Sequence, residues 1–328
     1  MTQFSQIDRR TMIRTTAATA VLGHHALTQQ STMAADALLS IVDTHQHLWD
    51  LEKFHLRWLK EAPEVLRRSY LYDDYRNAVE GLNVTKCVYM EVDVVPSQQL
   101  DEANFVVALS NDSSNRTVAG VISGRCEREE FDAYITRFRD QPSIKGVRHL
   151  LQSEPPGYCL QPTFIRSVQR LGELGMSFDL TIKPTELDDG LQLVQQCPET
   201  RFVVDHCGVA DPKAFMKNPG SVEPSHQADA WRKSMARLAD QENTICKISG
   251  IVAQAPPGWQ TEHLAPIVNH CLDVFGPERV VFGGDWPVCL LGAKFDRWVG
   301  SLKEIVSERP HTEQQNLFSE NAIRFYKL

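Results

Sequence analysis

Residues 39–47 read Leu-Ser-Ile-Val-Asp-Thr-His-Gln-His, a short apolar run that ends abruptly in ionisable side chains. Such a run, rich in β-branched residues, predicts a strand over Leu39–Asp43 that is buried on both faces. Seven further short apolar runs follow along the chain and are bounded by polar or turn residues. They predict strands over Cys87–Val92, Val118–Ile122, Gly146–Leu150, Ser177–Ile182, Phe202–Asp205, Ile245–Ile248 and Val280–Phe282.

The stretches between these strands place apolar residues at helical spacing. The clearest of them are Gln99–Ser110, Thr163–Leu174, Glu262–Phe275 and Phe295–Val306. Eight strands that alternate with helices over about 290 residues predict the α/β class and a single-domain (β/α)8 TIM barrel. An open doubly wound sheet is the alternative, and it is disfavoured because no G-x-G-x-x-G motif follows the first strand.

The composition excludes some classes of partner. The chain has 328 residues, 42% hydrophobic and 23% charged, with a net charge of -8. This balance disfavours nucleic acid and anionic membranes, which both require a basic surface. The eight cysteines form no C-x-x-C pair. Several lie inside apolar runs, so we expect them to be small core hydrophobes rather than disulfides or thiolate ligands.

The first 35 residues differ from the rest. Arg9-Arg10 precede a mildly apolar stretch, Thr15–Leu22, and the small pair Ala34-Ala35 follows. This order resembles a twin-arginine signal, which predicts export to the periplasm, and the stretch is too short and polar for a stable membrane anchor. We therefore divide the chain into a signal segment, 1–35, and a barrel domain, 36–328. The alternative is an unprocessed tail on a cytoplasmic protein.

Ionisable side chains gather at the carboxyl ends of the predicted strands, the edge where TIM barrels build their active sites. In chain order these residues are Asp43, His45, His47, Glu91, Asp93, Arg148, His149, Lys183, Asp205, His206, Lys247 and Asp285. Burying so many polar groups without partners would be costly, so their convergence predicts a functional site.

The pair His45 and His47 is the most informative part of this set. Alternate residues of a strand face the same side, so both imidazoles can reach one divalent metal ion. His206 and Asp285 would complete the site, and Asp285 could deprotonate a water molecule as general base. Asp285 could also cap a helix that begins near Pro287, and the two roles are compatible.

Five motifs resemble the amidohydrolase-2 family, and most of all its lactonase branch, which includes L-fuconolactonase, L-rhamnonolactonase and 2-pyrone-4,6-dicarboxylate lactonase. They are Asp43-Thr44-His45-Gln46-His47-Leu48-Trp49, Gly146-Val147-Arg148-His149, Asp205-His206-Cys207-Gly208, Cys246-Lys247-Ile248-Ser249-Gly250 and Gly283-Gly284-Asp285-Trp286-Pro287-Val288. The resemblance spans essentially the whole chain after the signal segment.

The resemblance implies hydrolysis of a cyclic ester, with a small-molecule substrate. Asp285 would activate water, while His206, Arg148 and His149 would bind substrate oxygens or the oxyanion. Arg148 and Lys183 offer only donors and would suit an anionic or polyhydroxylated substrate. Arg148 could instead form a salt bridge with Glu91 or Asp93. Trp49, Trp58 and Trp286 would line the pocket or fill the top of the barrel.

The resemblance also limits the metal content. Two-metal members of the family carry a lysine after the fourth strand and a histidine after the fifth, and this chain has Arg148-His149 and Lys183 there. We therefore expect at most one divalent ion, zinc or manganese. His45, His47 and Asp285 would be its ligands, with Glu91 or His206 as an extra one. A metal-independent site, in which the histidines bind substrate, is the alternative.

Two other functions fit the same residues. Related barrels with a similar His-x-His and Asp set are non-oxidative decarboxylases, and carbon dioxide among the products would identify that chemistry. A catalytically silent binding protein is the other alternative, although His45, His47, His206 and Asp285 are all present.

Overall fold

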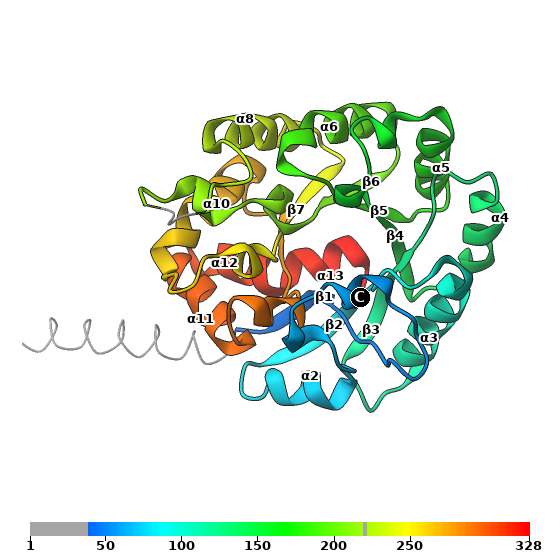
Figure 1. The fold of residues 1–328 in the computed structure, drawn as a ribbon, viewed down its shortest axis with the longest axis horizontal. Helices are drawn as coiled ribbons and strands as arrows, with labels where there is room; N and C mark the ends of the chain where they lie inside the picture. Colours follow the sequence, from blue (N-terminus) through cyan, green and yellow to red (C-terminus); the bar gives the residue numbers. More distant parts are fainter. Residues whose placement is uncertain (1–38, 219–221) are drawn as a thin grey trace, which may run out of the picture. The chain divides into compact units, whose positions relative to one another are not determined.

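The computed structural model of the chain describes residues 39–218 and 222–328. Eight parallel strands form one sheet in the order β1 to β8, and each is hydrogen-bonded to the next. They are β1 (Ile41–Gln46), β2 (Val84–Met90), β3 (Thr117–Ser123), β4 (Ile144–Leu150), β5 (Ser177–Thr181), β6 (Arg201–Val204), β7 (Thr244–Ile248) and β8 (Val280–Phe282). Helices surround the strands (Figure 1), which confirms the predicted α/β class and the (β/α)8 barrel.

The helices that follow the strands are α2 (Tyr72–Ala78), α3 (Gln99–Asn111), α4 (Phe131–Ile135), α5 (Pro162–Glu173), α6 (Leu187–Gln196), α7 (His206–Val209), α8 (Ala228–Ala239), α9 (Ile251–Gln254), α10 (Thr261–Phe275), α11 (Phe295–Ile305), α12 (His311–Gln315) and α13 (Asn321–Tyr326). The four helices predicted from apolar spacing correspond to α3, α5, α10 and α11, with ends that agree within one residue. The predicted signal segment, 1–35, lies outside the described residues. Within the described part, no helix is long and apolar enough to cross a bilayer.

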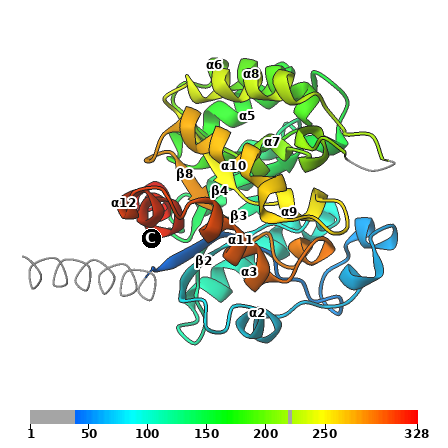
Figure 2. The same ribbon diagram turned by 90° about the vertical axis from the view of Figure 1, so that its left-hand side faces the viewer.

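The strands are covered on both faces, as their continuous apolar runs predict. All six residues of β1 are buried, and α5 buries Phe164, Val168 and Leu171, which recur at i, i+4 and i+7 on the face toward the sheet. The C-terminal helix α13 fills the end of the barrel where the strands begin, because Ala322 and Tyr326 pack against inward-facing valines. Figure 2 shows this helix on the side where β1 begins. The polar strand ends therefore meet at the opposite end.

The seam between β1 and β8 closes the barrel largely through side chains. A single β-bridge, Gln46 to Trp286, joins this edge of the sheet, and the His47 amide donates to the Trp286 carbonyl at 2.8 Å. The Asp43 carboxylate accepts the Gly284 amide at 2.7 Å and the His45 amide at 3.0 Å. The same carboxylate accepts the Tyr75 hydroxyl of α2 at 2.8 Å. One buried carboxylate thus joins β1, the segment after β8 and α2.

Replacing Asp43 with Ala is expected to lower the free energy of unfolding by about 3 kcal/mol, because two buried amides and one hydroxyl lose their acceptor. Denaturant unfolding followed by circular dichroism measures this change. Asp73→Ala is the control, because the Asp73 side chain is 77% exposed and pairs only with Arg76 on the surface; its effect should stay within about 0.5 kcal/mol. Equal stability of the two variants would contradict the role given to Asp43.

Candidate active site

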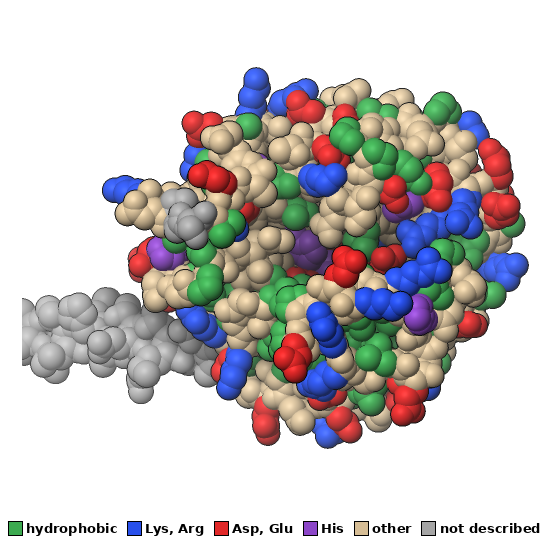
Figure 3. Space-filling view, in the orientation of Figure 1, with side chains coloured by type: hydrophobic (Ala, Val, Ile, Leu, Met, Phe, Trp, Pro, Cys, Tyr) green, Lys and Arg blue, Asp and Glu red, His purple; other side chains and the backbone are tan. Residues whose placement is uncertain are grey.

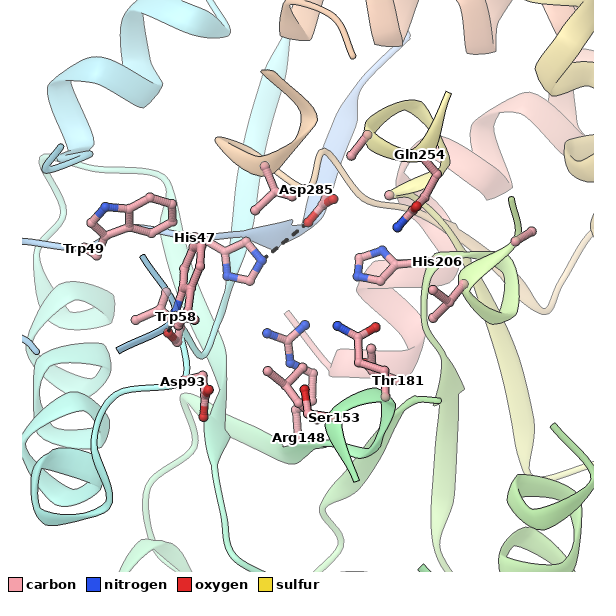
Figure 4. Close-up of a pocket in the computed structure, with 18 residues that line it drawn as sticks. His47, Trp49, Trp58, Asp93, Arg148, Ser153, Thr181, His206, Gln254 and Asp285 are labelled. Carbon is pink, nitrogen blue, oxygen red and sulfur yellow. Dashed lines mark hydrogen bonds and ion pairs between the residues drawn. The ribbon is translucent and has the colours of Figure 1, made fainter. Parts of the chain in front are cut away.

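A cavity of about 280 Å³ opens at the carboxyl ends of the strands. The space-filling view shows its mouth as a hollow with a histidine side chain at the floor (Figure 3). Residues predicted from the sequence line it, among them His47, Trp49, Arg148, His206 and Asp285. They come from four strand ends, those of β1, β4, β6 and β8, and face one another across the cavity (Figure 4).

Asp285 lies between the two histidines of the first strand. Its Oδ1 is 3.5 Å from His47 Nε2 and 3.7 Å from His45 Nε2. Two ligands of a tetrahedral zinc ion at about 2.1 Å would lie about 3.4 Å apart, so these separations fit one shared ion. His47 Nδ1 faces the Met90 carbonyl at 3.0 Å. A donated N–H there leaves Nε2 free as a ligand, the usual support for a metal-binding histidine.

The donor set therefore fits a single divalent ion held by His45, His47 and Asp285, and these three residues form one compact group of potential ligands. Arg148 Nη1 lies 3.2 Å from His45 Nε2. A bound ion would have to displace this guanidinium from the nitrogen. The three ligands thus allow one metal ion, and without an ion the guanidinium of Arg148 provides a positive charge beside His45 Nε2.

Beneath the cavity lies a buried network of charges centred on Lys247. Its ammonium donates to Asp179 Oδ2 at 2.7 Å and lies 2.9 Å from Asp205 Oδ1 and 3.3 Å from His45 Nδ1. None of these four side chains has exposed surface. Burial opposes the charged form of Asp205, but the charges around it, that of Lys247 first, and the hydrogen bond from Thr181 together outweigh burial and hold the pKa of this carboxyl at about 2. The network fixes the floor of the site.

The two histidines nearest this network are neutral at neutral pH. Burial lowers the pKa of His45 well below its ordinary value, and the charge of Lys247 lowers it further. Burial also lowers the pKa of His206, although the carboxylates of Asp285 and Asp205 oppose the shift. Neutral imidazoles can donate or accept a hydrogen bond, or ligate a metal, without first losing a proton.

His206 enters the cavity from an unusual turn directly after β6. The four residues of α7 all have positive φ, and three of them, His206, Cys207 and Val209, are not glycine. Left-handed backbone costs such residues about 1–2 kcal/mol each. The turn is held by Asp205, whose carbonyl accepts the Gly208 amide at 2.9 Å. His206 Nδ1 lies 2.9 Å from the Ser249 hydroxyl, which fixes the ring.

Arg148 is already paired. Its Nε donates to Glu91 Oε1 at 2.6 Å and its Nη2 donates to the Glu91 carbonyl at 2.8 Å. Arg148 thus forms the salt bridge with Glu91 that the sequence analysis gave as an alternative to substrate binding. The other carboxylate oxygen of Glu91 accepts the Asp93 amide at 2.7 Å. Both oxygens of Glu91 are thus engaged, and the structure does not bring Glu91, predicted as a metal ligand, into the group around Asp285.

Three predicted substrate-binding residues do not line the cavity: His149, Lys183 and Trp286. Side chains alternate along β4, so the residue after inward-facing Arg148 points outward, and the ring of His149 packs on Phe164. Burial lowers the pKa of His149 to about 3.

Lys183 lies beyond the end of β5. Its ammonium donates to Glu186 at 3.2 Å on the half-exposed surface. Trp286 is buried between the rings of Tyr70 and Tyr75. Trp286 therefore packs at the top of the barrel and does not line the cavity.

Asp179 and Gln254 belong to the site, although the sequence analysis did not single them out. Asp179 and Lys247 stand within apolar strands at inward positions, and the β4–β5 register sets Arg148 opposite Asp179. A charged residue inside each of two buried apolar strands was the feature of the sequence that could have identified this pair. Trp58 and Gln254 also line the cavity, from a 3-10 helix over Arg57–Lys60 and from the last position of α9, and both elements are too short for the sequence pattern to define.

The family model described as amidohydrolase matches residues 42–328. The chain belongs to the amidohydrolase family. This confirms the predicted family and the enzyme class, a hydrolase. The amidohydrolase is 27% identical over 299 residues to an L-fucono-1,5-lactonase of Burkholderia multivorans, an alignment that covers 88% of this chain and 96% of the relative.

Two solved structures share the fold of this amidohydrolase. A Burkholderia multivorans amidohydrolase with bound zinc aligns with a TM-score of 0.75 and 24% identity over 88% of this chain and 99% of that one. A probable 2-pyrone-4,6-dicarboxylic acid hydrolase of Acinetobacter baumannii aligns with a TM-score of 0.69 and 17% identity over 88% and 100% of the two chains. At these identities the likeness extends to the fold alone.

Gly250 is expected to be essential for the position of His206. Its φ is +68°, and a Cβ there would overlap the His206 imidazole. Gly250→Ala should therefore displace the ring and lower kcat/KM about 100-fold, the usual cost of a misplacement near 1 Å. Gly258→Ala is the matched control, because Gly258 has a φ of +79° and nothing within 4 Å of an added Cβ. Similar kcat/KM values for the two variants would contradict this role.

Proposed function

We propose that this amidohydrolase hydrolyses a neutral lactone, with Asp285 as the general base. The observation that carries the proposal is the position of the Asp285 carboxylate. It lies in the cavity, 3.5 Å from His47 and 3.7 Å from His45, and faces Arg148 and His206. A base on one side of a cavity and hydrogen-bond donors on the other is the arrangement that acyl transfer to water requires.

In the proposed reaction Asp285 accepts a proton from water while the water oxygen bonds to the lactone carbonyl carbon. The carbonyl oxygen becomes an oxyanion, and the ring C–O bond then breaks. The protonated Asp285 returns its proton to the departing alkoxide, and the hydroxy acid product ionises in solution. Each turnover thus releases one proton from a neutral substrate.

Arg148 and His206 are the proposed partners of the oxyanion. Glu91 holds the Nε and Nη2 of Arg148, which leaves Nη1 directed toward His45 and the cavity. A hydroxyl proton donated by Ser249 to His206 Nδ1 would leave Nε2–H as a donor to substrate. A divalent ion bound by His45, His47 and Asp285 would polarise the carbonyl or acidify the attacking water.

The charges around the cavity favour a neutral substrate over an anionic one. Each nearby cation among the described residues has a carboxylate partner: Arg148 with Glu91 at 2.6 Å, Arg125 with Asp93 at 2.9 Å, and Lys183 with Glu186 at 3.2 Å. A substrate carboxylate would meet Asp93 and Asp285 on the cavity wall, and each of these three cations already has a carboxylate partner. Of the two substrate types predicted from Arg148 and Lys183, the polyhydroxylated one is therefore favoured.

The relatives support the same chemistry. Curated relatives are named L-fucono-1,5-lactonase and, at 25% identity over 56% of this chain, L-rhamnono-gamma-lactonase of Scheffersomyces stipitis. Both names describe lactones of sugar acids, and such a lactone carries no charge while its ring is closed. They add support to a substrate class that the charge distribution favours independently.

Asp285→Asn is expected to abolish acid release from sugar lactones in a pH-indicator assay, with kcat falling at least about 1000-fold, because an amide cannot accept the proton from water. Parent and variant are assayed both chelator-treated and zinc-reloaded, and their metal content is measured. This separates loss of the base from loss of a metal ligand. Carbon dioxide among the products would instead identify a decarboxylase, and equal activity of the variant would contradict the mechanism.

The charge argument predicts substrate preference. For whichever aldonolactone is hydrolysed, the aldarolactone of the same configuration, with a terminal carboxylate, should show a kcat/KM at least about 10-fold lower, equal to about 1.4 kcal/mol. Asp93→Asn frees Arg125 beside the cavity and should reduce the ratio of kcat/KM for the aldonolactone to kcat/KM for the aldarolactone. Asp229→Asn frees Arg232 on the exposed face of α8 and should leave it unchanged. A preference for the aldarolactone in the parent would contradict a neutral substrate.

A further inference from the structure

Three of the eight cysteines gather directly behind the turn that carries His206. They are Cys207 in α7, Cys246 in β7 and Cys271 in α10, and their sulfur atoms all lie within 4.8 Å of one another. None of the three side chains has exposed surface. All eight cysteines of the chain are free thiols, and this triad is the one all-cysteine group with ligand spacing in the described residues.

The three thiols interact with one another. Each sulfur atom lies within 4.8 Å of the other two. Cys207 Sγ also approaches the Lys247 carbonyl at 3.8 Å. The proposed hydrolysis uses none of these sulfur atoms.

We propose that Cys207, Cys246 and Cys271 bind one soft, thiophilic metal ion of the Cu(I) type. Thiolates are the ligands that select Cu(I), and a small group of sulfurs without oxygen donors disfavours harder ions. Three thiolates at about 2.3 Å from one ion in a plane would lie about 4.0 Å apart. The sulfur separations of up to 4.8 Å therefore require an inward movement of less than about 1 Å. The ion replaces thiol protons, which are released.

The strained turn α7 gives the ion access to the sulfur atoms and links its binding to the position of His206. The ion reaches the buried sulfurs through transient opening of α7, whose left-handed residues make it a natural place for local opening. Cys207 directly follows His206 in the chain, and its carbonyl accepts the indole N–H of Trp231 at 2.9 Å. Drawing Cys207 toward β7 and α10 therefore moves the backbone that positions His206. Metal binding at the triad lowers activity from behind the cavity.

The test is a competition for Cu(I) between the full-length protein and bicinchoninate, a coloured chelator, in anaerobic buffer. The parent should withdraw one equivalent of Cu(I) per chain, and X-ray absorption of the complex should show sulfur ligands alone. Cys271→Ala and Cys246→Ala should each weaken binding at least about 100-fold. Cys159→Ala is the matched control, because Cys159 is buried but outside the triad, and it should bind as the parent does.

Activity gives a second readout. One equivalent of Cu(I) should inhibit the parent and Cys159→Ala but not Cys271→Ala, whose residue lies on α10 away from the cavity. Failure of the parent to withdraw Cu(I), or equal withdrawal by parent and both triad variants with folding confirmed by circular dichroism, would overturn the site. Because binding is read without substrate, this result is independent of whether the enzyme hydrolyses lactones.

Discussion

The ammonium group of Lys247, buried with Asp179, Asp205 and His45, is the interaction on which the site depends. Taking these charges out of water is costly, and the cost is recovered only if every donor finds an acceptor. The ammonium donates to Asp179 Oδ2 at 2.7 Å and lies 2.9 Å from Asp205 Oδ1 and 3.3 Å from His45 Nδ1. Asp205 also accepts the Thr181 hydroxyl at 2.7 Å. The network thereby ties β1, β5 and β7 to the end of β6 at the depth where the cavity begins.

The sequence predicted the barrel and the centre of its site because both follow from local patterns. Short apolar runs define the strands, and His45, His47 and Asp285 follow at their ends, where a barrel must gather them. His149 was wrongly paired with Arg148, since adjacent strand residues point to opposite faces. Lys183 does not line the cavity for another reason: it lies beyond β5, where the chain has already turned to the surface.

Other features depend on contacts between distant segments, which no local pattern encodes. Glu91 was predicted as a metal ligand, but its carboxylate accepts a hydrogen bond from Arg148, which is 57 residues away in the sequence. The cysteine triad joins positions 207, 246 and 271 without any short spacing that would reveal it. Trp58 and Gln254 reach the cavity from helical segments of only four residues each. Their places are set by the packing of the whole barrel rather than by the periodicity of one element.

The seam at Asp43 has a consequence for how this protein can evolve. The residue that closes the barrel stands two positions before His45, and its carboxylate accepts the amide of that same histidine. Mutational drift in this stretch cannot erase the chemistry while sparing the scaffold, because one short segment serves both. A lineage that abandoned catalysis would still be selected to retain much of the motif. Preservation of this stretch in a descendant is therefore poor evidence that the descendant is still an enzyme.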